Sequence, residues 1–478
     1  MKEFKLIKIL AHSFFLFLFL FAACYYIERM LYSDSSFYTF KILCFEKFNI
    51  EAGRYSAFLT QILPLIFVKL NAGLRTVMVS YSVSFIVIYY LIFLVCMYVF
   101  SSLKAGLAAT FVLFLGISDC SLYPITELQL GMLSTVMFYG FLEYYFQHES
   151  RFPAAKKILF ILIGAAIILV CLFSHPSTLF PVLFVLIFQL IDKQIYRNKA
   201  IYILILIAII AYGIKFLSVD TNSYEGHQME PLKNLVAILK NFTNINSVYF
   251  FMKFVLKGVY VLPILLFIIS LGYYAVKREY LKFAYTGIAT IGFFILLMVV
   301  FSPGDSDVGM EKNIIPLWIF VTIPFIHDVL FQKFRHTYLR SIIYVGVVIL
   351  GLAGFYRATV IYGDRIHYMK QIIEISSETL DSGKIIIEKK NLNQYRLGST
   401  WSFANETLLL SSLKGPEHAT TVFLVDDLNQ LNDFDLQVTD VYLCVPFWLQ
   451  WNYNSLNQRY FQLPDEPYKI MISPIPGN

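Results

Sequence analysis

The apolar run ILAHSFFLFLFLFAACYYI, residues 9–27, decides the fold class of this chain. It contains no acidic residue, lysine or arginine, and at 1.5 Å per residue it is long enough to cross about 30 Å of hydrocarbon as a helix. Further apolar runs of roughly 17–25 residues follow along the chain. Only 15% of its 478 residues are charged, whereas soluble domains have about 25%. The sequence therefore predicts an α-helical polytopic membrane protein.

The residues before this run indicate its orientation. Lys2, Lys5 and Lys8 precede it, and membrane-flanking segments rich in lysine and arginine usually stay in the cytoplasm. We therefore expect a cytoplasmic N-terminus and an outer loop after residue 27. We interpret the run as a retained first helix, and a cleaved signal sequence ending near Cys24 is the alternative.

Eleven spans account for the hydropathy pattern of residues 1–362, the predicted transmembrane domain. They are expected at residues 9–27, 76–100, 105–117, 128–146, 158–173, 178–191, 200–217, 254–274, 283–301, 314–331 and 341–360. With this register, three basic residues fall in each of the four later inner loops, within residues 148–157, 192–199, 277–282 and 332–340. The outer loops collect acids, namely Asp34, Asp119, Asp220, Glu225, Asp305 and Asp307. Moving the register by one helix would invert this distribution.

The composition changes after residue 362, and no spanning run follows it. The stretch 365–380 has helical spacing. Short strands are expected at residues 384–390, 420–427 and 440–448. Residues 363–478 are therefore predicted to form a small α/β domain, of a size that can fold independently. An odd number of spans makes this domain extracytoplasmic, on the side of the first outer loop, residues 28–75.

The stretch ERMLYSDSSFYTFKILCFEKFNIEAGRYSAFLTQ, residues 28–61, follows the first run directly. It contains Asp34 and Arg54, and its polar and aromatic residues alternate without a clean period. This pattern is typical of a segment that lies at a membrane surface. Residues 57–70 are apolar, but they are too few for a span and include Pro64, so we expect a re-entrant or interfacial segment. A solvated loop with an ordinary share of charges is the alternative.

Further polar residues are expected on the same outer side. They are, in chain order, Asp119 and Glu127 after the third span, His175 after the fifth, and Lys312 before the tenth. Ionisable residues at a membrane edge are costly and tend to mark functional sites.

These residue types suit acid–base and phosphate chemistry. A carboxylate beside a neutral or cationic partner can take a proton from a hydroxyl group. Cationic and hydrogen-bonding groups can hold a phosphate leaving group. Each residue also has a structural alternative, because His175 can cap a helix, Glu127 can stabilise a helix N-terminus, and Lys312 can act as an interfacial anchor.

Several function classes are disfavoured by what the sequence lacks. The six cysteines form no CxxC pair and no cluster with histidine, so neither a zinc site nor a disulfide framework is indicated. There is no GxxxxGK[ST] loop, which argues against nucleotide hydrolysis. The net charge of +6 belongs to the loops of a membrane protein, so we expect no nucleic-acid partner.

The order of these features resembles the GT-C superfamily of membrane glycosyltransferases, which includes the protein O-mannosyltransferases and the aminoarabinose transferases. In that family a catalytic aspartate follows the first helix, the place that Asp34 occupies in YSDSSFYTF. Membrane-surface helices come next, like GRYSAFLTQILPLIF, and a second acid follows the third helix, like Glu127 in YPITEL. A basic residue before a late proline-rich helix matches Lys312 in EKNIIPLWIFVTIP. The first loop has no DxD or Asp-Glu pair, so the resemblance leaves a divalent cation open.

The resemblance implies a glycosyltransferase that inverts the anomeric carbon. Its donor would be a sugar on a polyprenyl phosphate or diphosphate that enters from the membrane lipid, and its acceptor a glycan, lipid or protein. Asp34 would act as general base on the acceptor hydroxyl, with Glu127 as a second catalytic acid. The residues expected to bind the donor and its phosphate are Arg54, His175, Lys312 and Asp119.

Two other functions compete with this one. A transporter or flippase of a lipid-linked saccharide would show related halves and polar or broken helices at the membrane midplane. Prolines interrupt three predicted helices, but midspan charges are scarce, with Arg357 as the main exception. A non-catalytic assembly partner would use the outer domain for docking. We favour an enzyme, because the polar residues gather at loops on one face. We expect it in a bacterial inner membrane, and an outer face in the endoplasmic reticulum lumen is the alternative.

Overall fold

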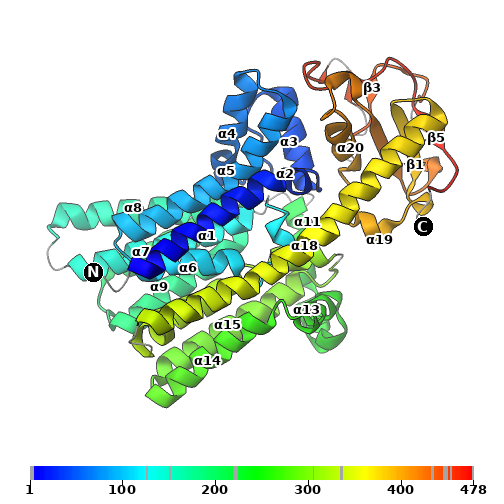
Figure 1. The fold of residues 1–478 in the computed structure, drawn as a ribbon. Helices are drawn as coiled ribbons and strands as arrows, with labels where there is room; N and C mark the ends of the chain where they lie inside the picture. Colours follow the sequence, from blue (N-terminus) through cyan, green and yellow to red (C-terminus); the bar gives the residue numbers. More distant parts are fainter. Residues whose placement is uncertain are drawn as a thin grey trace.

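The computed structural model describes residues 5–124, 127–149, 152–218, 224–304, 306–333, 337–431, 435–444, 451–452 and 455–475. The acids Asp220 and Asp305 and residues 445–450 of a predicted strand lie outside these ranges. A bundle of helices carries a smaller C-terminal unit at one end (Figure 1). We call this end of the bundle the domain end, and the end at which the first helix begins the opposite end.

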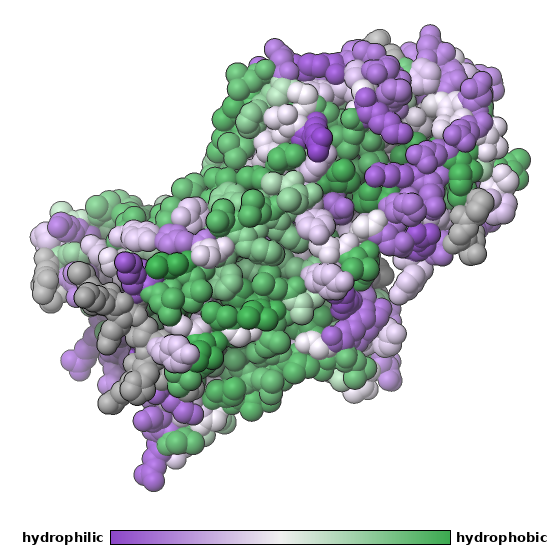
Figure 2. Space-filling model, viewed as in Figure 1, coloured by the Kyte–Doolittle hydropathy of each residue, from purple (hydrophilic) through white to green (hydrophobic). Residues whose placement is uncertain are grey.

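Seven helices of the described ranges are long and apolar enough to cross a membrane. They are α1 (Lys5–Cys24), α5 with a final π-turn (Leu74–Val99), α8 (Ala154–Ser174), α9 with a preceding 3-10 turn (Pro176–Lys193), α10 (Lys199–Leu217), α15 (Tyr280–Val300) and Tyr338–Leu380 of α18. On the face that Figure 2 shows, apolar residues cover most of the bundle, whereas hydrophilic residues cover much of the C-terminal unit. The chain is therefore a helical protein with the apolar spans of a membrane protein.

Two pairs of bent helices raise the number of spans to nine if each pair is one span. The axis of α13 (Asn246–Leu256) meets that of α14 (Val261–Lys277) at 91°. The axis of α16 (Asp307–Ile314) meets that of Leu317–Lys333, which comprises α17 (Leu317–Pro324) and a π-helical turn, at 47°. Before α13, the short helices α11 (Tyr224–Lys233) and α12 (Leu235–Lys240) occupy the long loop.

The third and fourth predicted spans differ from the others. α6 (Leu103–Phe114) has 12 residues and α7 (Glu127–His148) has 22. At about 18 Å, α6 is too short to cross the hydrocarbon alone, and it is buried from Ala105 to Phe114. α7 is also largely buried and keeps the polar side chains of Gln129 and Glu143 inside the bundle. These helices form the interior of the bundle, and the count of eleven spans stays a prediction.

A glycine turns the chain back after α6. Gly116 has φ +67°, a conformation that L side chains rarely adopt. A Cβ atom at this position would also lie 2.7 Å from Nε1 of Trp318 on α17. Glycine at this position therefore lets the loop before α7 pack closely against α17.

One helix joins the bundle to the C-terminal unit. α18 (Thr337–Leu380) has 44 residues, which is about 66 Å and roughly twice the thickness of the hydrocarbon. The predicted domain boundary at residue 362 falls inside this helix, and the helical stretch predicted at 365–380 is its last part. Cβ atoms at Gly351 and Gly354 would lie 2.7 and 2.5 Å from carbonyl oxygens near the end of α6. The small residues therefore allow the two backbones to approach closely.

The C-terminal unit is built around a parallel sheet of three strands in the order β2–β1–β5. The strands are β1 (Lys384–Glu388), β2 (Thr421–Val425) and β5 (Lys469–Met471). The central strand β1 is buried along its whole length, as expected for a strand between two parallel neighbours. Two helices, α19 (Gln394–Leu397) and α20 (Phe403–Ser411), and an antiparallel pair, β3 (Val441–Tyr442) with β4 (Trp451–Asn452), complete the unit. β1 and β2 coincide with predicted strands.

The first loop is helical and lies against the C-terminal unit. Its helices are α2 (Tyr26–Met30), α3 (Asp34–Phe45) and α4 (Phe58–Lys69), and α4 is short, as expected from its sequence. α3 and α4 stand beside the C-terminal unit at the domain end (Figure 1). Residues that are several hundred positions apart in sequence therefore meet around Asp34.

Candidate functional site

Asp34 is the first residue of α3, and its side chain is 27% exposed. The hydroxyl group of Tyr123 donates a hydrogen bond to its Oδ2, and Nζ of Lys312 lies 3.4 Å from the same oxygen. No hydrogen bond from the described residues reaches Oδ1. Asp34 is therefore a partly exposed carboxylate with one oxygen held and the other open.

Tyr123 supplies a neutral donor to this carboxylate. Burial and the charge of Asp34 raise the pKa of Tyr123 well above its usual value. Lys312 also lies over the Tyr123 ring, with Nζ 5.5 Å from the ring centre. The phenol therefore keeps its proton and holds both partners of the ion pair.

Lys312 is held in place by its neighbour Glu311. The buried Glu311 carboxylate accepts hydrogen bonds from the backbone N–H groups of Ser118, Asp119 and Cys120, at 2.7, 3.0 and 2.9 Å. These residues belong to the loop after α6, which also supplies the tyrosine at the site. Glu311 therefore ties α16 to that loop, so that two elements approach Asp34 together.

A second ion pair lies near the first. Nη1 of Arg54 is 2.9 Å from Oε2 of Glu127, and both side chains are nearly buried, with exposed fractions of 10% and 5%. Arg54 precedes α4, and Glu127 is the first residue of α7. Unlike Asp34, Glu127 is matched by a buried cation in the described structure.

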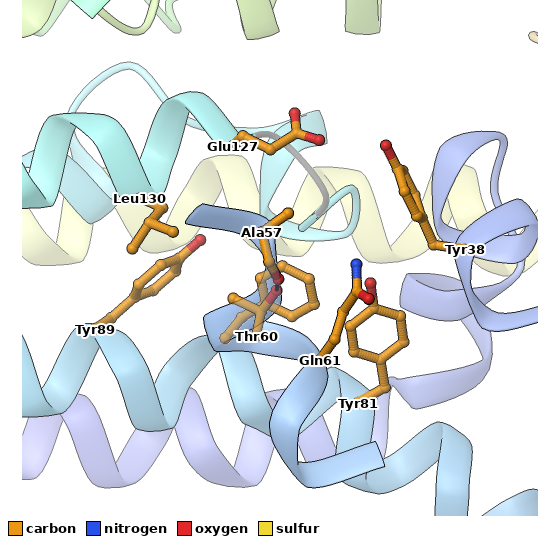
Figure 3. A pocket seen from close by; sticks show the side chains of 9 residues that line it. Tyr38, Ala57, Thr60, Gln61, Tyr81, Tyr89, Glu127 and Leu130 are labelled. Carbon is orange, nitrogen blue, oxygen red and sulfur yellow. Dashed lines mark hydrogen bonds between the residues drawn. The ribbon is translucent and has the colours of Figure 1, made fainter. Parts of the chain in front are cut away.

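Tyr38 lies within the electrostatic reach of both ion pairs. Burial, followed by the charges of Glu127 and Asp34, raises the pKa of Tyr38 well above its usual value. Its hydroxyl group and the Glu127 carboxylate point into the same small cavity, which Gln61 and Tyr81 also line (Figure 3). The cavity has about 10 Å³ of water-accessible volume, which is room for about one water molecule.

His175 lies between α8 and α9, within the electrostatic reach of the same group. Its Nδ1 accepts a hydrogen bond from the backbone N–H of Ser177 at 3.2 Å, so it caps the turn that starts the next span. Burial, and then the positive charges of Arg54, Lys312 and Lys215, lower the pKa of His175 well below its usual value. The imidazole is therefore neutral at pH 7. The expectation that His175 caps a helix is confirmed, and a role in binding stays a prediction.

The lowered pKa of His175 predicts a pH dependence of stability. The unfolded chain binds a proton at this residue near pH 6.5, whereas the folded chain binds it only at lower pH. Stability should therefore decrease as the pH falls below 6.5. We expect the unfolding temperature of the purified protein to decrease between pH 7 and pH 5, and to decrease less in His175→Asn, whose side chain can keep the cap. An equal decrease in both proteins would contradict this assignment.

Asp119 does not join the group around Asp34. Its side chain is buried, and Oδ2 has no hydrogen-bond partner among the described residues. Burial raises its pKa, and the nearby charges that act on it belong to Arg357, Asp307, Lys257 and Lys253. The structure therefore brings together five of the six predicted site residues and places the Asp119 side chain apart from them.

Some residues that line an apolar groove follow residues of this group closely in the sequence. Phe180 and Phe184 of α9, Tyr285 and Phe293 of α15, and Phe320 of α17 are among its lining residues, and its free volume is about 250 Å³. Phe180 follows His175 by five residues, and Phe320 follows Lys312 by eight. The groove therefore lies between α9, α15 and α17, and two of these helices directly follow elements that carry residues of the site.

A network of buried charges lies at the opposite end of α9. Asp192, His327 and Asp328 form the one group of the described residues that could hold a metal ion, with ligand atoms within 4.8 Å of one another. Nζ of Lys282 lies 2.6 Å from Asp192 and 3.1 Å from Asp328. The lysine ammonium therefore already occupies the position next to these carboxylates, and the arrangement is an internal ion network.

Three parts of these sites are absent from the sequence-based candidates. Tyr123 can be recognised as a candidate from the sequence, since it precedes Pro124 in the segment that carries Glu127. The pair His327-Asp328 can also be recognised, because two ionisable residues interrupt an otherwise apolar run. No feature of the sequence distinguishes Tyr38, because tyrosines near membrane surfaces are common.

Known proteins give no further guide to this site. No protein-family model matches the chain, no curated protein matches it, and no solved structure matches it. The function of the chain has to be inferred from the geometry around Asp34.

Proposed function

We propose that the chain is a membrane glycosyltransferase that moves a sugar from a polyprenyl-phosphate-linked donor to an acceptor hydroxyl group at the domain end. The observation that carries this proposal is Asp34, a partly exposed carboxylate with one oxygen held by Tyr123 and Lys312 and the other open. Such a carboxylate suits a general base.

In the proposed reaction, Oδ1 of Asp34 takes the proton of the acceptor hydroxyl. The hydroxyl oxygen attacks the anomeric carbon as the bond from that carbon to the phosphate oxygen breaks. The polyprenyl phosphate leaves with the bonding electron pair, and the configuration of the sugar inverts. The acceptor is a glycan, a lipid or a protein.

The surrounding charges support the binding of a phosphate. Arg54, Lys312 and Lys215 all act electrostatically on His175. The neutral imidazole of His175 adds a hydrogen-bond donor at Nε2. Cationic groups of this kind stabilise a phosphate that gains charge as it leaves.

The apolar groove between α9 and α15 supports a lipid-linked donor. Its aromatic lining suits a prenyl chain, and it lies between helices that are apolar enough to span a membrane. A donor with its chain in this groove would carry its phosphate toward His175 and Lys312. We further propose a bacterial inner membrane location with a cytoplasmic N-terminus, on the basis of the charges in the loops.

The first test is turnover of a panel of polyprenyl-phosphate sugars by the purified protein, measured as release of polyprenyl phosphate. Lys312→Gln should raise the donor KM by about 10-fold or more, because a hydrogen bond to a charged group contributes about 1.5–3 kcal/mol. Lys312→Arg should restore part of the affinity, since it keeps the charge.

Lys414→Gln is the matched control, because Lys414 is 71% exposed in the C-terminal unit. It should leave the donor KM unchanged. Consumption of no donor by the wild-type protein would contradict the proposed function. An unchanged KM in Lys312→Gln would exclude this lysine from phosphate binding.

The buried ion network at the opposite end favours a second candidate, a transporter or flippase of a lipid-linked saccharide. Ionisable residues inside membrane proteins often belong to substrate or proton pathways, and His327 lies 3.1 Å from Asp192 in this network. For a transporter, vesicles containing the protein would move a labelled lipid-linked sugar between leaflets without releasing polyprenyl phosphate. Asp34→Asn would then leave this movement unchanged.

A further inference from the structure

The turn immediately before Asp34 has an unusual backbone. Ser33 has φ 50° and ψ −121°, in a region that residues other than glycine rarely adopt. Conformations of this kind cost about 1–3 kcal/mol and persist only where surrounding contacts hold them. Ser33 is buried, so the contacts that hold it can be identified.

Residues of the C-terminal unit provide two of these contacts. The backbone N–H of Ser33 donates to Oε1 of Glu406 at 2.6 Å. Nε1 of Trp401 donates to the Ser33 hydroxyl oxygen. The Ser33 carbonyl oxygen accepts hydrogen bonds from the Ser36 hydroxyl group at 2.7 Å and from the backbone N–H of Phe37 at 3.2 Å, both on α3. Two of these four partners are therefore more than 360 residues away in the sequence.

Glu406 forms a buried ion pair that extends these contacts. Its Oε2 pairs with Nη2 of Arg365 on α18, and the side chains are 0% and 3% exposed. Nη1 of Arg365 donates to the carbonyl oxygen of Leu31 at 2.8 Å, and its Nε donates to that of Leu397 at 2.7 Å. The pair therefore binds the backbone on both sides of Tyr32.

We propose that Arg365 and Glu406 are positioning residues that set the orientation of Asp34. The role assigned to Asp34 in catalysis rests on the proposed function, whereas the positioning itself does not. Arg365 holds the backbone carbonyl of Leu31, three residues before Asp34, and Glu406 holds the backbone N–H of Ser33, one residue before it. They determine where α3 begins and where its first side chain points.

Docking of the C-terminal unit does not depend on this pair alone. Nδ2 of Asn457 donates to the carbonyl oxygen of Leu43 at 2.9 Å. Arg459 pairs with Glu46 at 3.4 Å and contacts Asn71. These contacts join the unit to the first loop at a place separate from Ser33. A variant of Arg459 therefore serves as a control, because it weakens the docking of the C-terminal unit and leaves the contacts of Ser33 intact.

The test measures the reactivity of the Asp34 carboxylate directly. A carbodiimide with an amine nucleophile labels accessible carboxylates, and peptide mass spectrometry measures the rate at each one in the full-length protein. Glu406→Gln removes the charge that pairs with Arg365, and Arg365→Lys removes the fork that binds the carbonyl oxygens of Leu31 and Leu397. We expect both variants to raise the labelling rate of Asp34 by about threefold or more, and Arg459→Met to leave it unchanged.

Further outcomes separate this proposal from the proposed function. The labelling rate of Glu417, which is 62% exposed, is the internal reference and should be equal in all variants. Unchanged labelling of Asp34 in folded Arg365→Lys and Glu406→Gln would overturn the positioning role. Increased labelling in a protein that consumes no donor would support positioning and contradict the glycosyltransferase.

If the protein does consume a donor, kinetics provide a second readout. Glu406→Gln should lower kcat by about 10-fold while leaving the donor KM within about twofold, because only the base is displaced. A variant that merely loosened the C-terminal unit, such as Arg459→Met, should keep the wild-type kcat. Equal kcat values in the two variants would overturn the positioning role.

Discussion

Asp34→Asn is expected to lower kcat for sugar transfer by about 100-fold or more, since general-base catalysis contributes about 10²–10⁴-fold. The amide keeps the shape of the side chain and can still accept the hydrogen bond from Tyr123. It cannot take a proton from the acceptor hydroxyl. Donor binding should stay within about twofold of the wild-type value, because the phosphate is assigned to other residues. Release of polyprenyl phosphate and equilibrium binding of the donor measure the two quantities.

Glu127→Gln is the comparison for this variant. Glu127 is paired with the buried Arg54, and loss of one charge from a buried pair leaves the other uncompensated. Glu127→Gln should therefore lower the unfolding temperature more than Asp34→Asn does. If both variants keep wild-type activity and stability, the carboxylates of this group have no catalytic role, and the transporter or assembly partner becomes the better hypothesis.

Glu311→Ala is expected to reduce the free energy of unfolding by on the order of 3–6 kcal/mol, because each unsatisfied buried polar group costs about 1–3 kcal/mol. The Glu311 carboxylate is the acceptor for three backbone N–H groups of one loop. A loss of this size is a large part of a typical total of about 5–15 kcal/mol. The yield of folded protein and its unfolding temperature in detergent should both decrease strongly.

Asp307→Ala on the same helix is the control. Asp307 pairs with Lys253 and Lys257, but its side chain is 27% exposed. Partly exposed pairs contribute about 0–1 kcal/mol, so the unfolding temperature of this variant should remain close to that of the wild-type protein. The unfolding temperature of Glu311→Gln should lie between those of Glu311→Ala and Asp307→Ala, because its amide keeps one oxygen acceptor. Wild-type yield and unfolding temperature in Glu311→Ala would show that the loop does not depend on this carboxylate.

The sequence predicts most spans because lipid imposes one strong constraint, a run of about 20 apolar residues. α1, α8, α10 and α15 follow this constraint and were predicted within a few residues. α6 and α7 do not, since both are shielded by other helices and need not be long and apolar. The number of spans is therefore less predictable from hydropathy than their presence.

The candidate site was predictable in part for a related reason. Ionisable residues at the edge of apolar runs stand out in a sequence with few charges, which identifies Asp34, Arg54, His175 and Lys312. Hydropathy gives no information on which of these residues touch. Glu311, the neighbour of Lys312, binds the loop that carries Tyr123 through three hydrogen bonds, all from backbone groups. Backbone contacts of this kind leave no pattern in the sequence.

The contacts of Ser33 also bear on how the protein is made. Residue 33 leaves the ribosome early, but Glu406 is synthesised only about 20–75 s later at typical rates of translation. During that interval the turn before Asp34 lacks the groups that hold it. A chain that is truncated before residue 406 would therefore insert its first helices and still lack a finished site. Completion of the site at the end of synthesis would keep incomplete chains from acting on substrate.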